Sequence, residues 1–275
     1  MLASIALACL PLLAENPDPV YHRWGLDVNE EYWLWEQPGS TQVIWLLPGG
    51  AWTQGPGEFL SGEMSPLIQP FYDAGISVGV SGYGTEQPFP FPELALQDLV
   101  VHTRVDLGYQ DVTLVGRSSG AHMALFTGIT GVGLGAPDRV CVMQVPFSVL
   151  PLFGPDEVSD SLPHFDPSAQ TIGDLPAWIT LFGSSAYWPL VVPPDPDRQF
   201  CVIGPPKPLE FAPIPLPTGQ LLFPEDSHAA VTATLQAMMM ELGGWDVDYV
   251  DTWNGGALLD QVEQTQLWIE AELKN

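Results

Sequence analysis

The chain has 275 residues, of which 46% are hydrophobic and 15% charged, a composition typical of a globular protein with ample core. Its 33 acidic residues against 7 Lys and Arg give a formal net charge of −26. So few cations exclude binding to the phosphate backbone of nucleic acids and disfavour an anionic membrane surface. Only two of the cations are lysines, and the acidic surface fits a salty medium and an ordinary secreted protein about equally.

Residues 1–14, MLASIALACLPLLA, form an apolar stretch with the length of a signal-peptide core. No Lys or Arg precedes the stretch, and it is too short to cross a bilayer. Two interpretations stay open: a cleaved signal peptide of a secreted or periplasmic protein, or a short helix packed on a cytoplasmic one. Cys9, Cys141 and Cys201 form no disulfide framework and no metal-site spacing, and Cys141 is expected to be a buried free thiol.

Strand-like and helix-like segments alternate from about residue 25 onwards. Apolar, β-branched and aromatic runs predict strands at residues 32–36, 43–47, 76–80, 111–115, 140–145, 178–182 and 247–250. Helical spacing predicts helices at residues 64–74, 92–107, 229–242 and 258–273, and one that begins near residue 119. The first two strands, joined across residues 37–40, are expected to form a hairpin or to be neighbours. The alternation predicts a single α/β domain over residues 20–275, with a mostly parallel sheet covered by helices on both faces.

Residues 188–217 break this pattern, because they contain ten prolines in thirty residues. Proline removes a backbone donor and interrupts regular structure, so this Pro-rich segment is expected to be a long inserted loop. The segment follows the predicted strand at residues 178–182, whose end would border a functional site. That position favours a lid over an insertion without function.

The most informative motif is Gly116-x-Ser118-x-Gly120, which follows a predicted strand and precedes a predicted helix. The turn is so tight that glycine is needed on either side of the serine. The serine hydroxyl is then held over the strand end, at a helix N-terminus that favours developing negative charge. The motif in this context indicates a nucleophile elbow, with Ser118 as the nucleophile.

A second segment, upstream of the elbow, agrees with this interpretation. The predicted strand at residues 43–47 runs into Gly49-Gly50. Such a loop can point backbone N–H groups at an acyl oxyanion, together with the N–H of Ser119. A simple glycine turn is the alternative, and the position before the elbow favours the oxyanion hole.

These motifs resemble the α/β-hydrolase superfamily, in particular its esterase, hormone-sensitive-lipase-like and kynurenine-formamidase-like group. Pro48-Gly49-Gly50-Ala51-Trp52 looks like the group's His-Gly-Gly-x-Trp with Pro in place of His, and residues 116–122 are similar to its Gly-x-Ser-Ala-Gly-Gly-His. Residues 83–88, 91–98 and 175–183 are similar to further stretches of that group. The resemblance covers residues 25–186 best. It implies an α/β-hydrolase fold and a serine hydrolase that uses no metal or organic cofactor.

The chain departs from the family pattern at two positions of the catalytic triad. No Asp follows Gly183 at the family's spacing, and Ala257 stands where the family has its catalytic His. His228 is the last histidine of the chain, directly before a predicted helix and after a loop that normally borders the active site. We therefore expect His228 to be the substitute general base, with an exposed residue near a helix N-cap as the alternative.

The other histidines and the acid of the triad are less informative. His22 is expected on the surface, His102 in a structural role on a helix, and His164 in a polar loop. His122 matches a histidine that the family commonly has on the elbow helix, pointing away from the reacting face. The acid stays open among Asp226, near His228, and Asp195 and Asp197, which could fold over the site from the Pro-rich segment.

The sequence thus supports two functions. In the first, Ser118 and a base such as His228 cleave small carboxylic esters or aryl formamides, with backbone N–H groups of Gly49, Gly50 and Ser119 around the oxyanion. In the second, the chain is a non-catalytic binding protein of the same fold that has lost its triad His and Asp. The first is favoured, because a purely structural domain has no need of a strained turn with serine at its tip.

Overall fold

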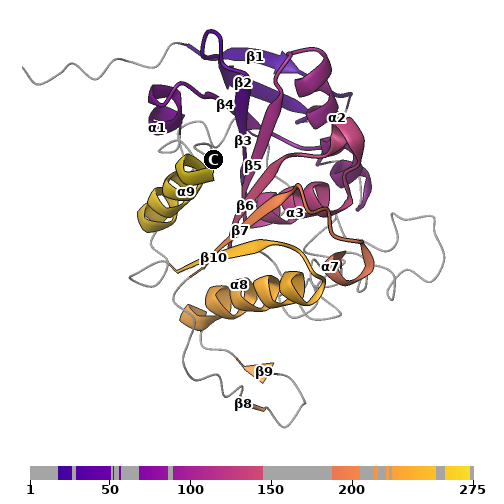
Figure 1. The fold of residues 1–275 in the computed structure, drawn as a ribbon, viewed down its shortest axis with the longest axis vertical. Coiled ribbons are helices and arrows are strands. Elements are labelled where there is room, and N and C mark those ends of the chain that lie inside the picture. Colours follow the sequence, from indigo (N-terminus) through magenta and orange to yellow (C-terminus); the bar gives the residue numbers. More distant parts are fainter. Residues whose placement is uncertain are drawn as a thin grey trace, which may run out of the picture.

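The computed structural model describes residues 18–26, 29–50, 52, 56, 68–85, 89–144, 188–204, 214–215, 221–222, 225–251 and 258–272. Its centre is an eight-stranded sheet with the order β1-β2-β4-β3-β5-β6-β7-β10 (Figure 1). The strands are β1 (Val20–Arg23), β2 (Glu31–Trp35), β3 (Gln42–Leu47), β4 (Ser77–Ser81), β5 (Asp111–Arg117), β6 (Arg139–Met143), β7 (Gln199–Gly204) and β10 (Val247–Asp251). β2 is antiparallel to both of its neighbours, and the strands from β4 to β10 are parallel. A separate short antiparallel pair consists of β8 (Ile214–Pro215) and β9 (Leu221–Leu222).

Helices cover both faces of the sheet (Figure 1). α1 (Ile68–Asp73) and α9 (Leu258–Glu272) pack on one face, and α2 (Phe91–Val105), α3 (Ser119–Thr130), α7 (Trp188–Val191) and α8 (Glu225–Leu242) on the other. Strand β3 shows the reason, because Val43, Trp45 and Leu47 point into the core beside α2 and α3. Ile44 and Leu46, between them, point into the core beside α1 and α9. A strand that is apolar on both sides requires a helical layer on each side.

Most predicted elements within the described residues are present, and the predicted α/β class is confirmed. The prediction that the first two strands form a hairpin or are neighbours is wrong, because β4 lies between β2 and β3 in the sheet. β3 pairs parallel with β4 and β5, and these two neighbours satisfy its buried backbone N–H and C=O groups. The predicted strand at residues 178–182 and the first residues of the helix predicted at 64–74 lie outside the described residues.

Part of the Pro-rich segment belongs to the sheet. Residues 188–191 form α7, and residues 199–204 form β7, which pairs parallel with both β6 and β10. The segment is free of proline between residues 197 and 204, so every residue of β7 keeps its backbone donor. The interpretation of the whole segment as a loop is therefore wrong. A lid formed by its later residues stays a prediction, since residues 205–213 and 216–217 lie outside the described part.

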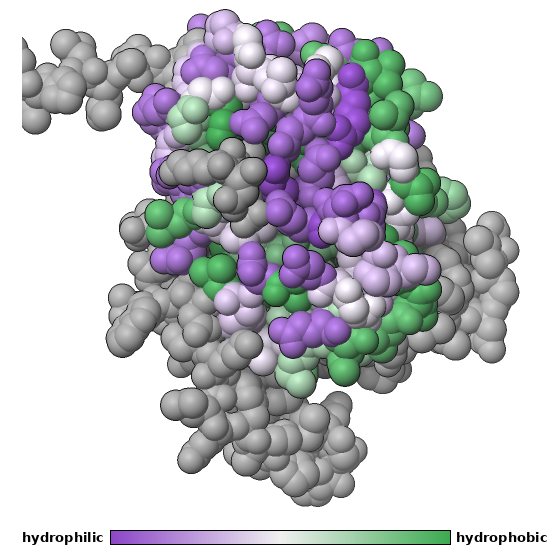
Figure 2. Space-filling model, in the orientation of Figure 1, coloured by the Kyte–Doolittle hydropathy of each residue, from purple (hydrophilic) through white to green (hydrophobic). Residues whose placement is uncertain are grey.

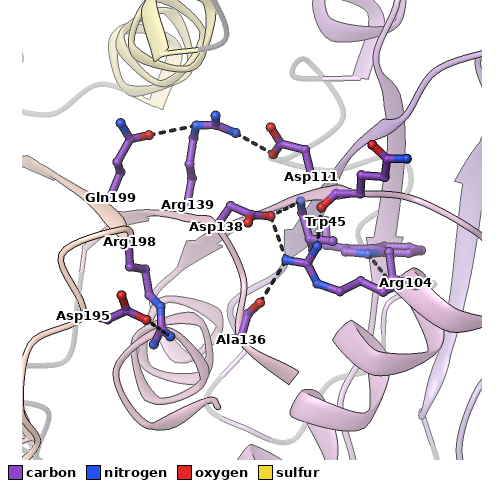
Figure 3. A network of polar contacts seen from close by, with 12 residues as sticks. Trp45, Arg104, Asp111, Ala136, Asp138, Arg139, Asp195, Arg198 and Gln199 are labelled. Atoms are coloured by element: carbon purple, nitrogen blue, oxygen red, sulfur yellow. Dashed lines mark hydrogen bonds and ion pairs between the residues drawn. The ribbon is translucent and has the colours of Figure 1, made fainter. Parts of the chain in front are cut away.

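Three of the five arginines lie at the edge where β5, β6 and β7 begin (Figure 3). Each binds an aspartate at 2.5–2.8 Å: Arg104 with Asp138, Arg139 with Asp111, and Arg198 with Asp195. Arg139 also donates to Gln199 of β7 at 2.9 Å, and Asp138 accepts from the backbone N–H of Val112 in β5 at 2.7 Å. These arginines thus stabilise the edge at which β5, β6 and β7 begin.

These internal pairs leave few cations to neutralise the other carboxylates, and hydrophilic side chains cover the centre of the face in Figure 2. We expect salt to stabilise the protein, because the Debye length falls from about 30 Å at about 0.01 M salt to about 3 Å at about 1 M. Weaker repulsion among the acidic side chains should raise the melting temperature by about 5 °C or more. Calorimetry in a NaCl series at neutral pH, beside a sucrose series as the non-ionic control, measures this. A flat NaCl curve would contradict the prediction.

The described cysteines are buried inside the sheet. Cys141 of β6 and Cys201 of β7 lie opposite each other in the parallel register, and neither is part of a disulfide. The prediction for Cys141 is therefore confirmed. Cys9 lies outside the described residues with the rest of residues 1–14, and both interpretations of that stretch stay predictions. Among the described helices, none has the length and apolar character that crossing a membrane requires.

Candidate active site

Ser118 occupies the turn between β5 and α3. Its φ of 54° and ψ of −122° form a backbone conformation that residues other than glycine rarely adopt. The flanking glycines make the turn possible. A Cβ atom at Gly116 would lie 2.3 Å from the Gly120 carbonyl oxygen, and one at Gly120 would lie 2.0 Å from the Leu47 carbonyl oxygen. Glycine on either side therefore leaves room for the turn, which holds the Ser118 side chain at the strand end.

The loop after β3 lies directly beside this turn. β3 and β5 pair in register up to Leu47 and Gly116, which brings the following residues of both strands together. A Cβ atom at Gly49 would lie 3.0 Å from Ser118 Cβ and 3.6 Å from Ser118 Oγ. Gly50 has a φ of 125°, a left-handed conformation that favours glycine. The structure therefore brings the predicted oxyanion segment to the predicted nucleophile.

Backbone hydrogen bonds fix the direction of the elbow. The Ser118 N–H donates to the Met143 carbonyl at the end of β6 at 3.0 Å, and the Ser118 carbonyl accepts from the His122 N–H at 3.1 Å. The N–H groups of Ser119 and Gly120 belong to the first turn of α3, where a helix has no internal acceptors. The positive end of the α3 dipole thus lies at Ser118, which suits a developing oxyanion.

Tyr83, two residues after β4, is buried between the two loops. Its hydroxyl lies 3.0 Å from the Pro48 carbonyl oxygen and 3.0 Å from Ser119 Oγ. Burial raises the pKa of the Tyr83 phenol well above its ordinary value, so the hydroxyl keeps its proton. In the sequence, Tyr83 stands in a motif without an assigned role, because its contacts arise from three separate strand ends.

His122 lies inside the core, in keeping with a structural role. The side chains of His122 and Glu93 are both 0% exposed, and Nδ1 of the first lies 3.6 Å from Oε1 of the second. The rings of Trp52 and Trp188 contact the imidazole edge-on, with centroids 5.2 and 4.8 Å away. Glu93 was missed at the sequence level, where a glutamate in the first turn of a helix gives no sign of complete burial.

His228 lies in the first turn of α8, which begins at Glu225, and not directly before the helix. Figure 1 shows α8 starting near the tip of β10, at the sheet edge where the parallel strands end. Ser118 follows β5 at the same edge. The description of residues 225–232 covers the backbone alone, so the role of His228 stays a prediction. Ala257 and His164 lie outside the described residues.

Two other histidines take no part in this arrangement. His22 is exposed on β1, as expected. His102 of α2 lies 2.7 Å from an Asp106 carboxylate oxygen and 3.2 Å from the Tyr32 hydroxyl, a structural role on the α2 side of the sheet.

Asp195 and Asp197 lie at the opposite edge of the sheet from Ser118. Both precede β7, whereas Ser118 follows the parallel strand β5. They line a hollow of about 320 Å³ together with Arg198 and neighbouring residues. Strands of six or seven residues separate the two edges by about 20 Å. The idea that either aspartate folds over the site is therefore wrong, and Asp226, in the first turn of α8, stays a candidate acid.

The residue directly before Ser118 in the sequence carries a positive charge. Arg117, directly before Ser118, is half-buried, and desolvation lowers the pKa of its guanidinium group.

Within the described ranges, no group of three or more His, Cys, Asp or Glu side chains is arranged to hold a metal ion. The chemistry that the described site offers is a serine hydroxyl beside backbone donors.

Several solved structures share this architecture. A thermophilic esterase from Thermogutta terrifontis is 15% identical over 94% of this chain and 92% of its own, with a TM-score of 0.58. An acetyl ester-xyloside bifunctional hydrolase from Caldicellulosiruptor lactoaceticus is 15% identical over 87% and 88%, with a TM-score of 0.55. An esterase of the bacterial hormone-sensitive lipase family is 18% identical over 95% and 86%, with a TM-score of 0.52. A scan of family models and a search of curated protein sequences find no match.

Proposed function

Because the chain has the α/β-hydrolase fold that its motifs predict, we propose that it is a serine hydrolase acting on small carboxylic esters or aryl formamides. The observation that carries this proposal is the conformation of Ser118, with a φ of 54° between β5 and α3 and Gly49 beside its hydroxyl. Such a conformation costs about 1–3 kcal/mol in a residue other than glycine. A strained serine in a glycine-flanked turn, with the Gly49-Gly50 loop beside it, suits a nucleophile better than a structural turn.

In the proposed reaction, Ser118 Oγ forms a bond to the carbonyl carbon of the substrate while His228 accepts its proton. The carbonyl oxygen becomes an oxyanion and accepts hydrogen bonds from the N–H groups of Ser119 and Gly50, with Gly49 beside them. The bond to the leaving alcohol or amine then breaks, and the leaving group takes the proton from the base. Water, which gives a proton to the same base, hydrolyses the acyl-enzyme and restores Ser118.

Ala257 favours a second candidate, a non-catalytic binding protein of the same fold. The family carries its catalytic His at this place, and the loss of a general base removes several orders of magnitude of rate. The two candidates differ in one chemical property, which is whether Ser118 reacts with an electrophile.

The test is hydrolysis of short-chain p-nitrophenyl esters and an aryl formamide by the purified full chain, followed by labelling with a fluorophosphonate. Mass spectrometry of the digested protein locates the label. Turnover together with a label on Ser118 supports the hydrolase, and His228→Ala then tests the base. An unlabelled, inert protein across several acyl lengths and salt concentrations would favour the binding protein.

A further inference from the structure

Tyr83 connects the two loops on which an oxyanion hole would be built. Pro48 directly precedes the Gly49-Gly50 segment, and Ser119 directly follows the nucleophile. The Tyr83 hydroxyl lies 3.0 Å from an oxygen atom of each, the Pro48 carbonyl and Ser119 Oγ. One side chain from a third element, the loop after β4, thus reaches both walls of the hole.

The Tyr83 hydroxyl, the Pro48 carbonyl and the Ser119 hydroxyl allow one assignment of hydrogen-bond donors and acceptors. The Pro48 carbonyl can only accept, so the Tyr83 hydroxyl donates its proton there. The Ser119 hydroxyl then donates to the remaining acceptor site of Tyr83. The side chains of Tyr83 and Ser119 are 0% and 1% exposed, so bulk water does not compete for either hydrogen bond. A buried chain of this kind holds its members in one geometry.

The two loops also touch each other through their backbones. A Cβ atom at Gly120 would collide with the Leu47 and Pro48 carbonyl oxygens at 2.0 and 2.6 Å. Van der Waals contact limits how closely the two loops approach but sets no preferred direction. The Tyr83 hydrogen bonds supply the direction that the close contact lacks.

We propose that Tyr83 is a positioning residue, which sets the distance between the Gly49-Gly50 amides and the Ser119 amide so that both reach one oxyanion. The proposal rests on the proposed serine hydrolase function. Donors have to lie at about 2.7–3.1 Å from the oxyanion, so a small displacement of one loop weakens the transition state more than substrate binding. Tyr83 itself touches neither substrate nor the reacting atoms.

Tyr83→Phe removes one hydroxyl and keeps the ring in the core. For a short-chain p-nitrophenyl ester, we expect kcat to fall about 10- to 100-fold while KM changes less than about twofold. The control is Tyr32→Phe, since Tyr32 is also 0% exposed; it loses one hydrogen bond, to His102, whereas Tyr83→Phe loses the bonds to Pro48 and Ser119. The control should keep its kcat even where its melting temperature falls by as much as that of Tyr83→Phe.

Ser119→Ala provides the second variant, because it removes one of the two hydrogen bonds and keeps the backbone N–H. We expect its kcat also to fall, and a double variant with Tyr83→Phe to be little worse than Tyr83→Phe alone, since the two share one interaction. If Tyr83→Phe fails to fold, an unchanged kcat in Ser119→Ala overturns the proposal.

The fluorophosphonate labelling rate of Ser118 separates the remaining outcomes. A labelling rate that falls with kcat in Tyr83→Phe, and not in Tyr32→Phe, supports the positioning role. An active wild type with equal kcat in both tyrosine variants overturns that role and leaves the serine hydrolase standing. A wild type that neither turns over nor labels overturns both.

Discussion

Ser118→Ala should lower kcat for a short-chain p-nitrophenyl ester by about 10⁴-fold or more and leave the circular dichroism spectrum unchanged. In the proposed reaction, the substitution removes the atom that would form the acyl-enzyme. Ser119 Oγ is bonded to Tyr83 in the core, so it is not available as a nucleophile. Steady-state kinetics of both proteins, with intact-mass detection of an acyl adduct, measures the effect.

The control for this substitution is Ser77→Ala. Ser77 is also buried, on β4, and its hydroxyl accepts a hydrogen bond from the Gln37 N–H at 2.9 Å. The Ser77→Ala protein should lose some stability and keep its kcat. Retention of wild-type kcat by Ser118→Ala would refute the acyl-enzyme, whatever the control does.

Local sequence signals were sufficient for the elbow and for most strands. The run 112–115 is mostly apolar and is followed at once by Gly116-x-Ser118-x-Gly120, so strand, turn and helix are all encoded within twenty residues. The position of β4 between β2 and β3 was not predictable in the same way. Strand order depends on which buried edges pair, and this is a tertiary property that neighbouring residues do not encode.

An acid and a base for Ser118 were harder to predict, because the candidates follow strands that have to be identified first. By the family resemblance, an acid is expected after Gly183, whereas the strand between β6 and β10 in the sheet is β7, which ends at Gly204. The first carboxylate after Gly204 in the sequence is Glu210. β7 was not predicted, because the ten prolines of residues 188–217 indicated a loop and the short apolar run among them was given no weight. Tyr83 was similarly hidden, because its partners lie 35 and 36 residues away.

Gly120→Ala should destabilise the protein by about 2 kcal/mol or more and lower kcat by about 100-fold. The added Cβ atom would lie 2.0 Å from the Leu47 carbonyl oxygen, and a backbone atom cannot rotate away as a side chain can. The loop after β3 therefore has to move away from the elbow, and the oxyanion donors move with it. Chemical denaturation and steady-state kinetics on the same samples measure the two effects.

Two further glycines separate the effect on stability from the effect on the reaction. Gly135→Ala, where a Cβ atom would meet Gln97 at an ordinary 3.4 Å, should change neither quantity. Gly49→Ala would place its Cβ atom 3.0 Å from Ser118 Cβ and 3.6 Å from Ser118 Oγ, where the substrate carbonyl has to approach. It should therefore cost less stability than Gly120→Ala, while lowering kcat about as much. If Gly49→Ala and Gly120→Ala instead lose kcat only in proportion to their stability, the two loops hold the fold together and do not shape a reaction site.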